Sequence, residues 1–472
     1  MKRITPAELS KHNTVSDAWL SIDGLVFDVT DFLEGHPGGR RVMLPFLGKD
    51  ATAEFRRFHN PKLRRAWLCR GFGCGFEFEG GVRGPSLDQG WKSPYYKESH
   101  HRVRAWARDL VDRELMPYIH EWDTAGEVPI SVYRKMGELG LLSCMIGVFP
   151  WPDYAPNPPP AGVNPAEWDM FHELVVTDEL NRIASVGINQ FFWKELLIKP
   201  CLSGQKNIAL GITEPYAGSD VANILTTATK TPDGKHYVLN GEKKWITTGN
   251  WAENGGISLI LVDRTTPGFS SRPVPCQGCR GSGTAYLMME DCKVPVENLI
   301  GKENQGFSYI MKNFNHERLS GTIATVRLAR VCYEEAFVYA HKRRTFGKIL
   351  FEHGVIRNKL GHMLRQIEAT QAWVEFICYQ LTQMSKEDAL HKMGGPTALL
   401  KAQTTQVLEY CAREASQILG GVSYTKGGLG EKVERIYRDV RGLAIPGGSE
   451  EIMLDLGVRQ AQKMSESFGA KL

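Results

Sequence analysis

The chain has 472 residues with a net charge of +4, and 23% of its residues are charged. This length exceeds what one hydrophobic core usually serves, so we expect two or more domains. The mild charge argues against nucleic acid as a partner, and no apolar run is long enough to cross a bilayer. The ten cysteines are scattered, with one close pair at Cys276 and Cys279, which favours structural or free thiols in a reducing, intracellular compartment.

The first 75 residues are expected to form a compact unit that carries two histidines in turns. A short hairpin is expected over Trp19–Val29 around an Asp23-Gly24 turn. An H-P-G-G motif begins at His36, and His59 follows 23 residues later beside apolar helical segments. Two such histidines could hold a planar metal cofactor from both sides, because neutral imidazole is a good axial ligand for haem iron.

These motifs resemble the cytochrome b5 family, in which H-P-G-G is followed by D-A-T, here Asp50 to Thr52, and then by a second histidine. The resemblance implies a haem b with His36 and His59 as its two axial ligands. With both iron positions filled, such a haem carries electrons and does not activate oxygen. The second half of the loop is one residue shorter than in the animal cytochromes, and a haem-free docking module is the alternative interpretation.

Residues 76–94 have the composition of a linker, and periodicity divides the chain that follows into three parts. Helical spacing runs from Val103 to Leu110, and a seam from Ile356 to Met384, spaced by fours and threes, suits a helix in a four-helix bundle. Between the helical parts the sequence alternates as strands do. The expected parts are helical over 95–205, β over 206–300 and helical over 301–472, which makes the fold class α+β.

Two stretches of the β part have the composition of a ligand-binding site. Residues 211–220 read G-I-T-E-P-Y-A-G-S-D, which is typical of a turn. Residues 244–249 read K-W-I-T-T-G, and an Asn240-Gly241 type I′ turn is expected to place Trp245 on the return strand of a hairpin. Exposed backbone N–H groups, hydroxyls and an indole would suit a flat cofactor. The residues alone also allow two polar turns in a β domain.

The same stretches resemble the acyl-CoA dehydrogenase family, whose pattern T-E-P-x-A-G-S-D is followed by W-I-T, and the resemblance extends from about Tyr95 to the C-terminus. It implies a helical domain, a β-barrel-like middle domain and a C-terminal four-helix bundle. It also implies that FAD and an acyl-CoA thioester are bound here, with Ser219 contacting both. The implied FAD contacts in this region are Ile212, Thr213, Gly218, Ser219, Trp245, Ile246 and Thr247.

Dehydrogenation of a thioester at Cα and Cβ needs a base for the α-proton, donors for the carbonyl oxygen and a hydride acceptor, here FAD. The family's usual base lies in an I-Y-E-G-T-S loop, but residues 445–451 read I-P-G-G-S-E-E and place Gly447 there. The family's other position lies in an E-R-L context, which Glu317 supplies. The resemblance therefore implies Glu317 as the base and the Gly447 amide, with a ribityl hydroxyl of FAD, as donors. Glu450 and Glu451 are rival carboxylates on the wrong side of the glycine pair.

Further family segments imply contacts with the rest of both ligands. Asn315 and Arg318 fall where the family contacts the CoA nucleotide. Residues 343–348 resemble R-K-T-F-G-K, which reaches the FAD of a neighbouring subunit, and an arginine-rich helix surface is the alternative there. A homodimer or homotetramer with shared FAD sites follows. The implied FAD contacts in these segments are Arg343, Thr345, Phe346, Gln417, Gly420, Gly421, Ser449 and Glu451.

The resulting hypothesis is a flavin-dependent acyl-CoA dehydrogenase of fatty acid metabolism that forms a trans-2-enoyl-CoA. Electrons would pass from FAD to the fused haem and from there to an acceptor that the sequence does not identify. An acyl-CoA oxidase that uses O2 and a non-catalytic scaffold that binds FAD and haem are the alternatives, whereas a nitroalkane oxidase would need Asp at position 447. The ending Ala470-Lys471-Leu472 resembles the serine-lysine-leucine address, so we expect a peroxisomal or a cytoplasmic protein.

Overall fold

The computed structural model describes residues 5–22, 25–30, 33, 40–52, 54–55, 92–192, 199–205, 208–246 and 258–467. The chain separates into two compact units, Met1–Glu79 and Gly80–Leu472. Several predicted features lie outside the described residues: the Asp23-Gly24 turn, most of the 76–94 linker, His36, His59, Thr247 and the C-terminal tripeptide.

The first unit contains a three-stranded antiparallel sheet in the order β1-β2-β3. Strands β2 and β3 pair with Ile22 opposite Leu25, which confirms the predicted hairpin. Alternate residues of β2 are buried, among them Leu20, and they join Phe27 and Leu47 in a small apolar core. The described elements are α1 Pro6–Leu9, β1 Asn13–Thr14, β2 Asp17–Ile22, β3 Leu25–Asp28, η1 Arg40–Val42 and η2 Leu44–Phe46.

The second unit begins with a helical part whose buried helix, α7 (Met170–Leu180), packs against α4. Asp169 caps α7 by accepting hydrogen bonds from the backbone N–H groups of Phe171 and His172. Every residue of α7 is buried, as expected for a helix covered on all sides. The other helices of this part are α4 Glu98–Leu110, α5 Ile119–Ala125, α6 Ile130–Glu138, α8 Val186–Phe192 and α9 Lys199–Leu202, with a π-helical turn η3 Val111–Leu115 after α4.

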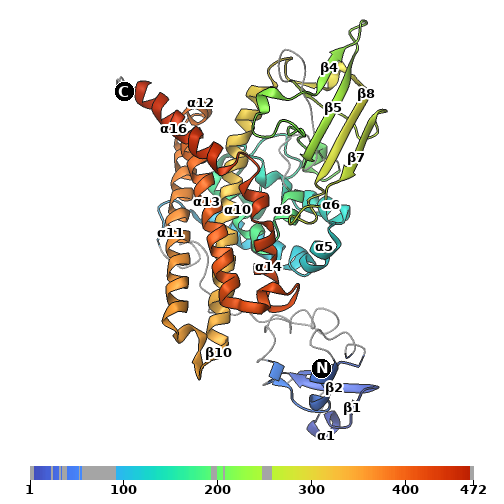
Figure 1. Ribbon diagram of the computed structural model, residues 1–472, viewed down its shortest axis with the longest axis vertical. Helices are drawn as coiled ribbons and strands as arrows, with labels where there is room; N and C mark the ends of the chain where they lie inside the picture. Colours follow the sequence, from blue (N-terminus) through green and yellow to red (C-terminus); the bar gives the residue numbers. More distant parts are fainter. Residues whose placement is uncertain are drawn as a thin grey trace. The chain divides into compact units, whose positions relative to one another are not determined.

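A four-stranded antiparallel sheet in the order β4-β5-β8-β7 forms most of the middle segment. Figure 1 shows this sheet in green and yellow beside the helices. A separate pair, β6 and β9, contributes Leu259 to a small cluster around Ile310 of helix α10 (Gly306–Lys342). The strands are β4 Thr227–Lys230, β5 His236–Ile246, β6 Leu259–Ile260, β7 Phe269–Pro273, β8 Ala285–Pro295 and β9 Leu299–Ile300.

The expected Asn240-Gly241 turn is wrong, because β5 continues through both residues to Ile246. The pairing of β5 with β8 shifts register between Leu239 and Gly241, so the dipeptide forms an irregularity within one long strand. A Cβ at Gly241 would lie 2.5 Å from Thr226 Oγ1, so the close approach of the segment before β4 requires a glycine here. Asn240 Nδ2 donates to Asp291 Oδ1 at 3.0 Å, so its side chain bridges to β8.

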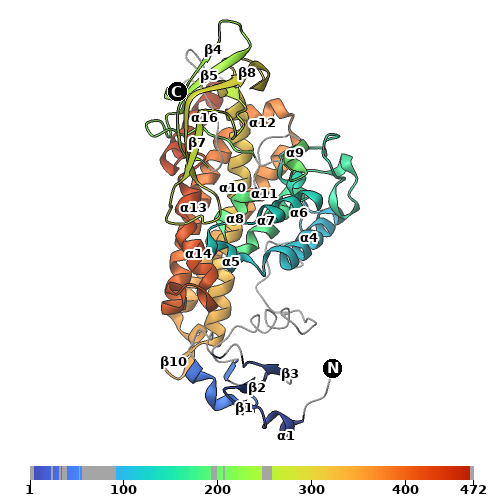
Figure 2. The same ribbon diagram turned by 90° about the vertical axis from the view of Figure 1, so that its right-hand side faces the viewer.

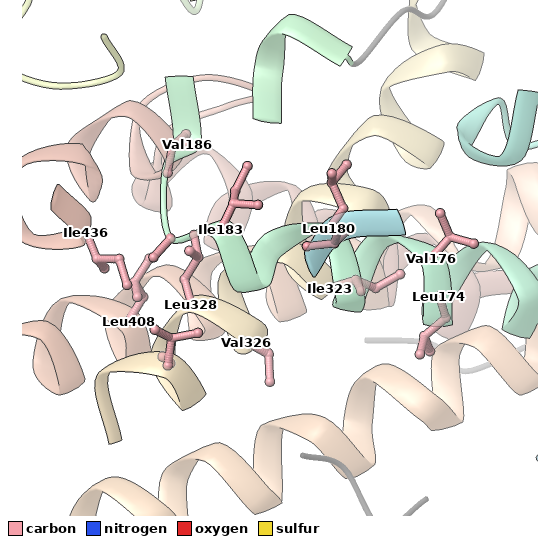
Figure 3. Packing of buried hydrophobic residues seen from close by; sticks show 14 of the residues in the cluster. Leu174, Val176, Leu180, Ile183, Val186, Ile323, Val326, Leu328, Leu408 and Ile436 are labelled. Atoms are coloured by element: carbon pink, nitrogen blue, oxygen red, sulfur yellow. The ribbon is translucent and has the colours of Figure 1, made fainter. Parts of the chain in front are cut away.

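The C-terminal part contains the long helices α10, α11 and α13 (Figure 2), and α10 and α11 pack against α7. The predicted seam is confirmed in α11, where Leu360, Met363 and Ile367 are buried, although Met384 lies just beyond the helix end. Figure 3 shows Leu174 and Val176 of α7 together with Ile323 of α10 in one apolar core. The helices are α10 Gly306–Lys342, α11 Gly354–Gln383, α12 Lys386–Lys392, α13 Gly394–Leu419, α14 Glu431–Asp439, α15 Arg441–Ala444 and α16 Glu450–Ser467, with a hairpin of β10 Arg344–Thr345 and β11 Lys348–Ile349.

Candidate functional site

A cavity of about 830 Å³ lies between the middle segment and the C-terminal helices. This volume falls within the roughly 300–1,000 Å³ that is usual for sites that bury a small ligand or cofactor. Its walls come from segments far apart in the sequence: residues 208–221, the end of β5, α10, α13, residues 442–448 and α16. The predicted site residues that line it are Ile212, Thr213, Gly218, Ser219, Trp245, Ile246, Glu317, Arg318 and Gly447.

Glu317 reaches the cavity from α10 and is half-buried, whereas Leu319 faces the apolar core. The next residue, Arg318, is only 9% exposed. Burial lowers the pKa of the Arg318 guanidinium, and the charge of Glu317 opposes that shift. Arg318 lies over the ring of Phe314 at 5.3 Å and donates to Asn315 Oδ1 at 3.4 Å. Asn315 is not among the residues that line the cavity.

Gly447 lies in the loop between α15 and α16 and faces the same cavity. Gly447 and Gly448 have φ values of 70° and 104°, a backbone region that other residues rarely adopt. The nearest atom to a Cβ at Gly447 would be Cγ of Arg318 at 3.9 Å, so a side chain there would enter the cavity. Arg318 Nε donates to the Gly447 carbonyl at 2.8 Å, which connects this loop to the helix that carries Glu317.

Lys401 of α13 also lines the cavity and was not singled out by the sequence analysis. Its Nζ donates to the carbonyls of Ala444 at 2.6 Å and Gly448 at 2.7 Å. Burial lowers the pKa of this ammonium group to about 8. The available signal was a lone lysine inside a helix segment of small and apolar residues, Leu399-Leu400-Lys401-Ala402.

The turn over residues 211–220 is fixed by a buried carboxylate, Glu214. Glu214 accepts hydrogen bonds from the N–H of Leu225, from the N–H of Thr226 and from Lys243 Nζ. Burial raises the pKa of Glu214, but the hydrogen bond from Lys243 and its companions outweigh burial and leave that pKa below its usual range. Gly218 presents open space, since no described heavy atom lies within 4 Å of where its Cβ would stand.

The two stretches that the sequence analysis paired do lie together, because Lys244 N–H donates to the Thr213 carbonyl at 2.9 Å. Trp245 follows with a positive φ of 56° and leaves 53% of its surface exposed. The ammonium group of Lys244 lies 4.4 Å from the centroid of the Trp245 ring. The cavity therefore combines the exposed ring of Trp245, the hydroxyls of Thr213 and Ser219 and the open space beside Gly218. This combination fits a flat, polar-edged ring system such as a flavin.

A pair of Glu173 and His316, the residue before Glu317, was also not predicted from the sequence. Glu173 of α7 is fully buried and accepts from Gly147 N–H at 3.0 Å, Ser320 Oγ at 2.9 Å and His316 Nε2 at 2.6 Å. Burial lowers the pKa of His316, but the charge and hydrogen bond of Glu173 outweigh burial and raise that pKa. The pair joins α7 to α10 one residue before Glu317.

The remaining predicted contacts do not line this cavity within one chain. The β10–β11 hairpin follows α10, and its tip residue Phe346 is 95% exposed. From Glu317 to the end of α10 the helix axis rises by about 37 Å. Glu450 accepts a hydrogen bond from Thr405 Oγ1 at 3.0 Å and so turns towards α13. The predicted residues outside the cavity are Asn315, Arg343, Thr345, Phe346, Gln417, Gly420, Gly421, Ser449 and Glu451.

Models of four known domain families match most of the chain. The model of the cytochrome b5-like heme/steroid binding domain matches residues 5–84. The models of the N-terminal, middle and C-terminal domains of acyl-CoA dehydrogenase match residues 97–194, 209–292 and 304–462. Among the described residues no helix combines the length and the apolar character that crossing a membrane requires.

Individual relatives agree with these matches. The chain is 39% identical over 431 residues to acyl-CoA dehydrogenase apdG of Emericella nidulans, covering 82% of this chain and 96% of that protein. It is 36% identical over 404 residues to acyl-CoA dehydrogenase AFT10-1 of Alternaria alternata, covering 78% and 92%. The crystal structure of a putative acyl-CoA dehydrogenase from Mycobacterium smegmatis is similar with a TM-score of 0.70 at 30% identity, covering 78% and 99%. The glutaryl-CoA complex of glutaryl-coenzyme A dehydrogenase gives a TM-score of 0.66 at 25% identity, covering 79% and 97%.

Proposed function

The chain belongs to the acyl-CoA dehydrogenase family and carries a cytochrome b5-like domain at its N-terminal end, and from this premise we propose that it desaturates an acyl-CoA to a trans-2-enoyl-CoA and passes the electrons from FAD to a haem b of the same chain. The observation that carries the proposal is the position of Glu317 and Gly447 on one cavity with Ser219 and Trp245. A base, an amide donor and a wall suited to a flavin are the parts that this reaction needs.

In this proposal the carboxylate of Glu317 removes the α-proton of the bound thioester. The backbone N–H of Gly447 donates to the thioester oxygen, which gains negative charge as that proton leaves. Arg318 holds the Gly447 carbonyl and thereby limits the motion of the loop relative to Glu317. FAD, when bound, supplies the acceptor for the β-hydride.

The residues that would hold FAD come from two regions. Thr213, Ser219 and Trp245 would contact its ring system from the cavity wall. Arg343 and Phe346, which are remote from Glu317 in the same chain, would contact the FAD of a second subunit, and a homodimer or homotetramer would complete each site. Gln417, Gly420 and Gly421 at the end of α13 would belong to the same shared contact.

The haem part of the proposal depends on His36 and His59, which would hold the haem iron. When bound, the haem would supply an acceptor that takes one electron at a time from the reduced flavin. Placing it on the chain that carries the flavin would raise the effective concentration of the acceptor.

An anaerobic stopped-flow experiment with a series of acyl-CoA esters tests the proposal. Flavin absorbance should bleach first, and the absorbance of reduced haem should appear afterwards in the same sample. The variant His59→Ala should keep the bleaching and lose the haem signal, because it removes only a ligand of the iron. Bleaching without later haem reduction in the intact protein would reject the relay, and peroxide formation in air at the rate of turnover would favour an oxidase. Absence of bleaching with every ester would reject the dehydrogenase itself.

A further inference from the structure

Lys401 places a buried ammonium group against the loop that carries Gly447. The residue is 6% exposed, and its Nζ donates to the carbonyls of Ala444 at 2.6 Å and Gly448 at 2.7 Å. One of these carbonyls precedes Gly447 in the chain and the other follows it. A single cation from α13 therefore holds both sides of the turn.

The loop has little means of fixing its own conformation. It reads Ile445-Pro446-Gly447-Gly448, in which two glycines with positive φ have wide conformational freedom and the proline has no N–H. Ile445 is 58% exposed and gives the loop little apolar anchoring. Its shape must therefore be imposed by neighbouring side chains.

Two buried cations impose that shape. Arg318 binds the Gly447 carbonyl, and Lys401 binds the carbonyls of Ala444 and Gly448. In a planar trans peptide the C=O and the N–H of the next residue point in opposite directions. The carbonyls of Ala444, Gly447 and Gly448 point towards the cations, so the N–H group of the residue after each of them points away from the cations. The peptide that carries the Gly447 amide lies between the held carbonyls, and its direction depends on how firmly they are held.

From this geometry we propose that Lys401 is a positioning residue that aims the Gly447 amide at the substrate's thioester carbonyl, an inference that rests on the proposed function. Lys401 acts through the loop and needs no contact with the reacting atoms. Its hydrogen bonds are charge-assisted and therefore stronger than those a neutral donor would make.

The charge of Lys401 has a cost that packing alone does not explain. Burying an ammonium group is unfavourable unless it is paired or hydrogen-bonded, and an apolar side chain of similar length would fill the same space without that cost. The charged groups around it are Glu450, Glu317, Arg318 and Arg441, two of each sign, so they offer no net opposite charge. The two loop carbonyls are thus its specific partners.

The variants Lys401→Met and Lys401→Arg test the inference, with Lys359→Met as the matched control. Lys359 of α11 forms an ion pair with Glu414 on the same helix as Lys401, but it does not contact the loop. Hydrogen–deuterium exchange over residues 442–449 of the substrate-free protein should rise in Lys401→Met alone. The limiting rate of flavin bleaching by acyl-CoA should fall about 100-fold, as expected for a displaced catalytic group. Lys401→Arg keeps a charged donor and should recover part of that rate.

Binding separates positioning from general damage. In a Glu317→Gln background, which stops turnover, Lys401→Met should weaken binding of acyl-CoA but leave binding of free CoA unchanged, because CoA has no thioester carbonyl. Unchanged exchange and rate in Lys401→Met, or equal losses of FAD, CoA and acyl-CoA binding, would overturn the inference. If Lys401→Met does not fold, Lys401→Gln is measured in its place, since its shorter, neutral side chain makes weaker hydrogen bonds than the ammonium group does. An intact protein that acyl-CoA does not bleach would reject the proposed function, whereas an active protein indifferent to Lys401 would reject only this inference.

Discussion

Arg318 Nε donates a 2.8 Å hydrogen bond to the carbonyl of Gly447, and this bond joins two segments that are 129 residues apart in the chain. This hydrogen bond fixes the loop that carries Gly447 relative to the helix that carries Glu317, and both residues line one cavity. A base on a helix can serve a donor on a loop only if their separation is fixed, since small displacements of catalytic groups are costly.

Replacing Glu317 with glutamine should abolish most of the activity while preserving the size and shape of the side chain. The amide has the shape of the carboxylate but cannot accept a proton, and loss of a general base typically lowers rates about 10²- to 10⁴-fold. Stopped-flow bleaching of the flavin measures the effect. Glu450→Gln is the control, because Glu450 is bonded to Thr405 and does not line the cavity. A full rate in Glu317→Gln, or an equal loss in Glu450→Gln, would contradict the assignment of the base.

A carboxylate restored at position 447 should rescue part of the lost activity. The double variant Glu317→Gln, Gly447→Glu is expected to bleach faster than Glu317→Gln alone, because a side chain at this position would enter the cavity. Rescue should be incomplete, since a non-glycine residue at positive φ costs roughly 1–2 kcal/mol. Gly447→Ala in the Glu317→Gln background carries the same backbone cost without a carboxylate and should give no rescue. Equal rates in the two double variants would show that the loop side chain does not reach the substrate carbon.

The pair of His316 and Glu173 should make the stability of the helical part depend on pH. The folded-state pKa of His316 is raised, so the stability from this pair is fully present below the unfolded histidine pKa of about 6.5 and is lost as the pH rises through the folded value. Urea unfolding, followed by circular dichroism across this range, should show that decline. His316→Gln should remove the pH dependence and cost about 3–5 kcal/mol, because it leaves a buried carboxylate without its cation. A decline of the same size in His316→Gln would assign it to other groups.

Shared FAD sites should allow two inactive variants to complement each other. Glu317→Gln removes the base, and Arg343→Gln removes the proposed contact with the FAD of the second subunit, about 37 Å along α10 from Glu317. In a mixed dimer one site would combine an intact Glu317 with an intact Arg343. Random mixing by co-expression should then restore about one quarter of the normal activity, from half of the dimers with one working site each. No recovery in mixtures that contain mixed dimers would show that each site is complete within one chain.

Much of the fold was available from local patterns in the sequence. The seam through Leu360, Met363 and Ile367 predicted a buried helix, since apolar residues at that spacing share one helix face. The hairpin at Ile22 and Leu25 followed from strand alternation and turn composition. The prediction of a turn at Asn240-Gly241 was wrong because the glycine is required by the close approach of Thr226, a contact that the dipeptide itself does not reveal.

The sequence by itself determined which groups are available: a carboxylate in an E-R-L context at Glu317, a glycine amide at Gly447 and the paired stretches around Ser219 and Trp245. Only the tertiary structure decided how these groups are held. The hydrogen bonds of Lys401 to the loop, and of Glu173 to His316, join segments that are distant in the chain, and such contacts leave no periodic or local signal. They form because burying charged groups is unfavourable without partners, and the packed fold alone determines which partners come within reach.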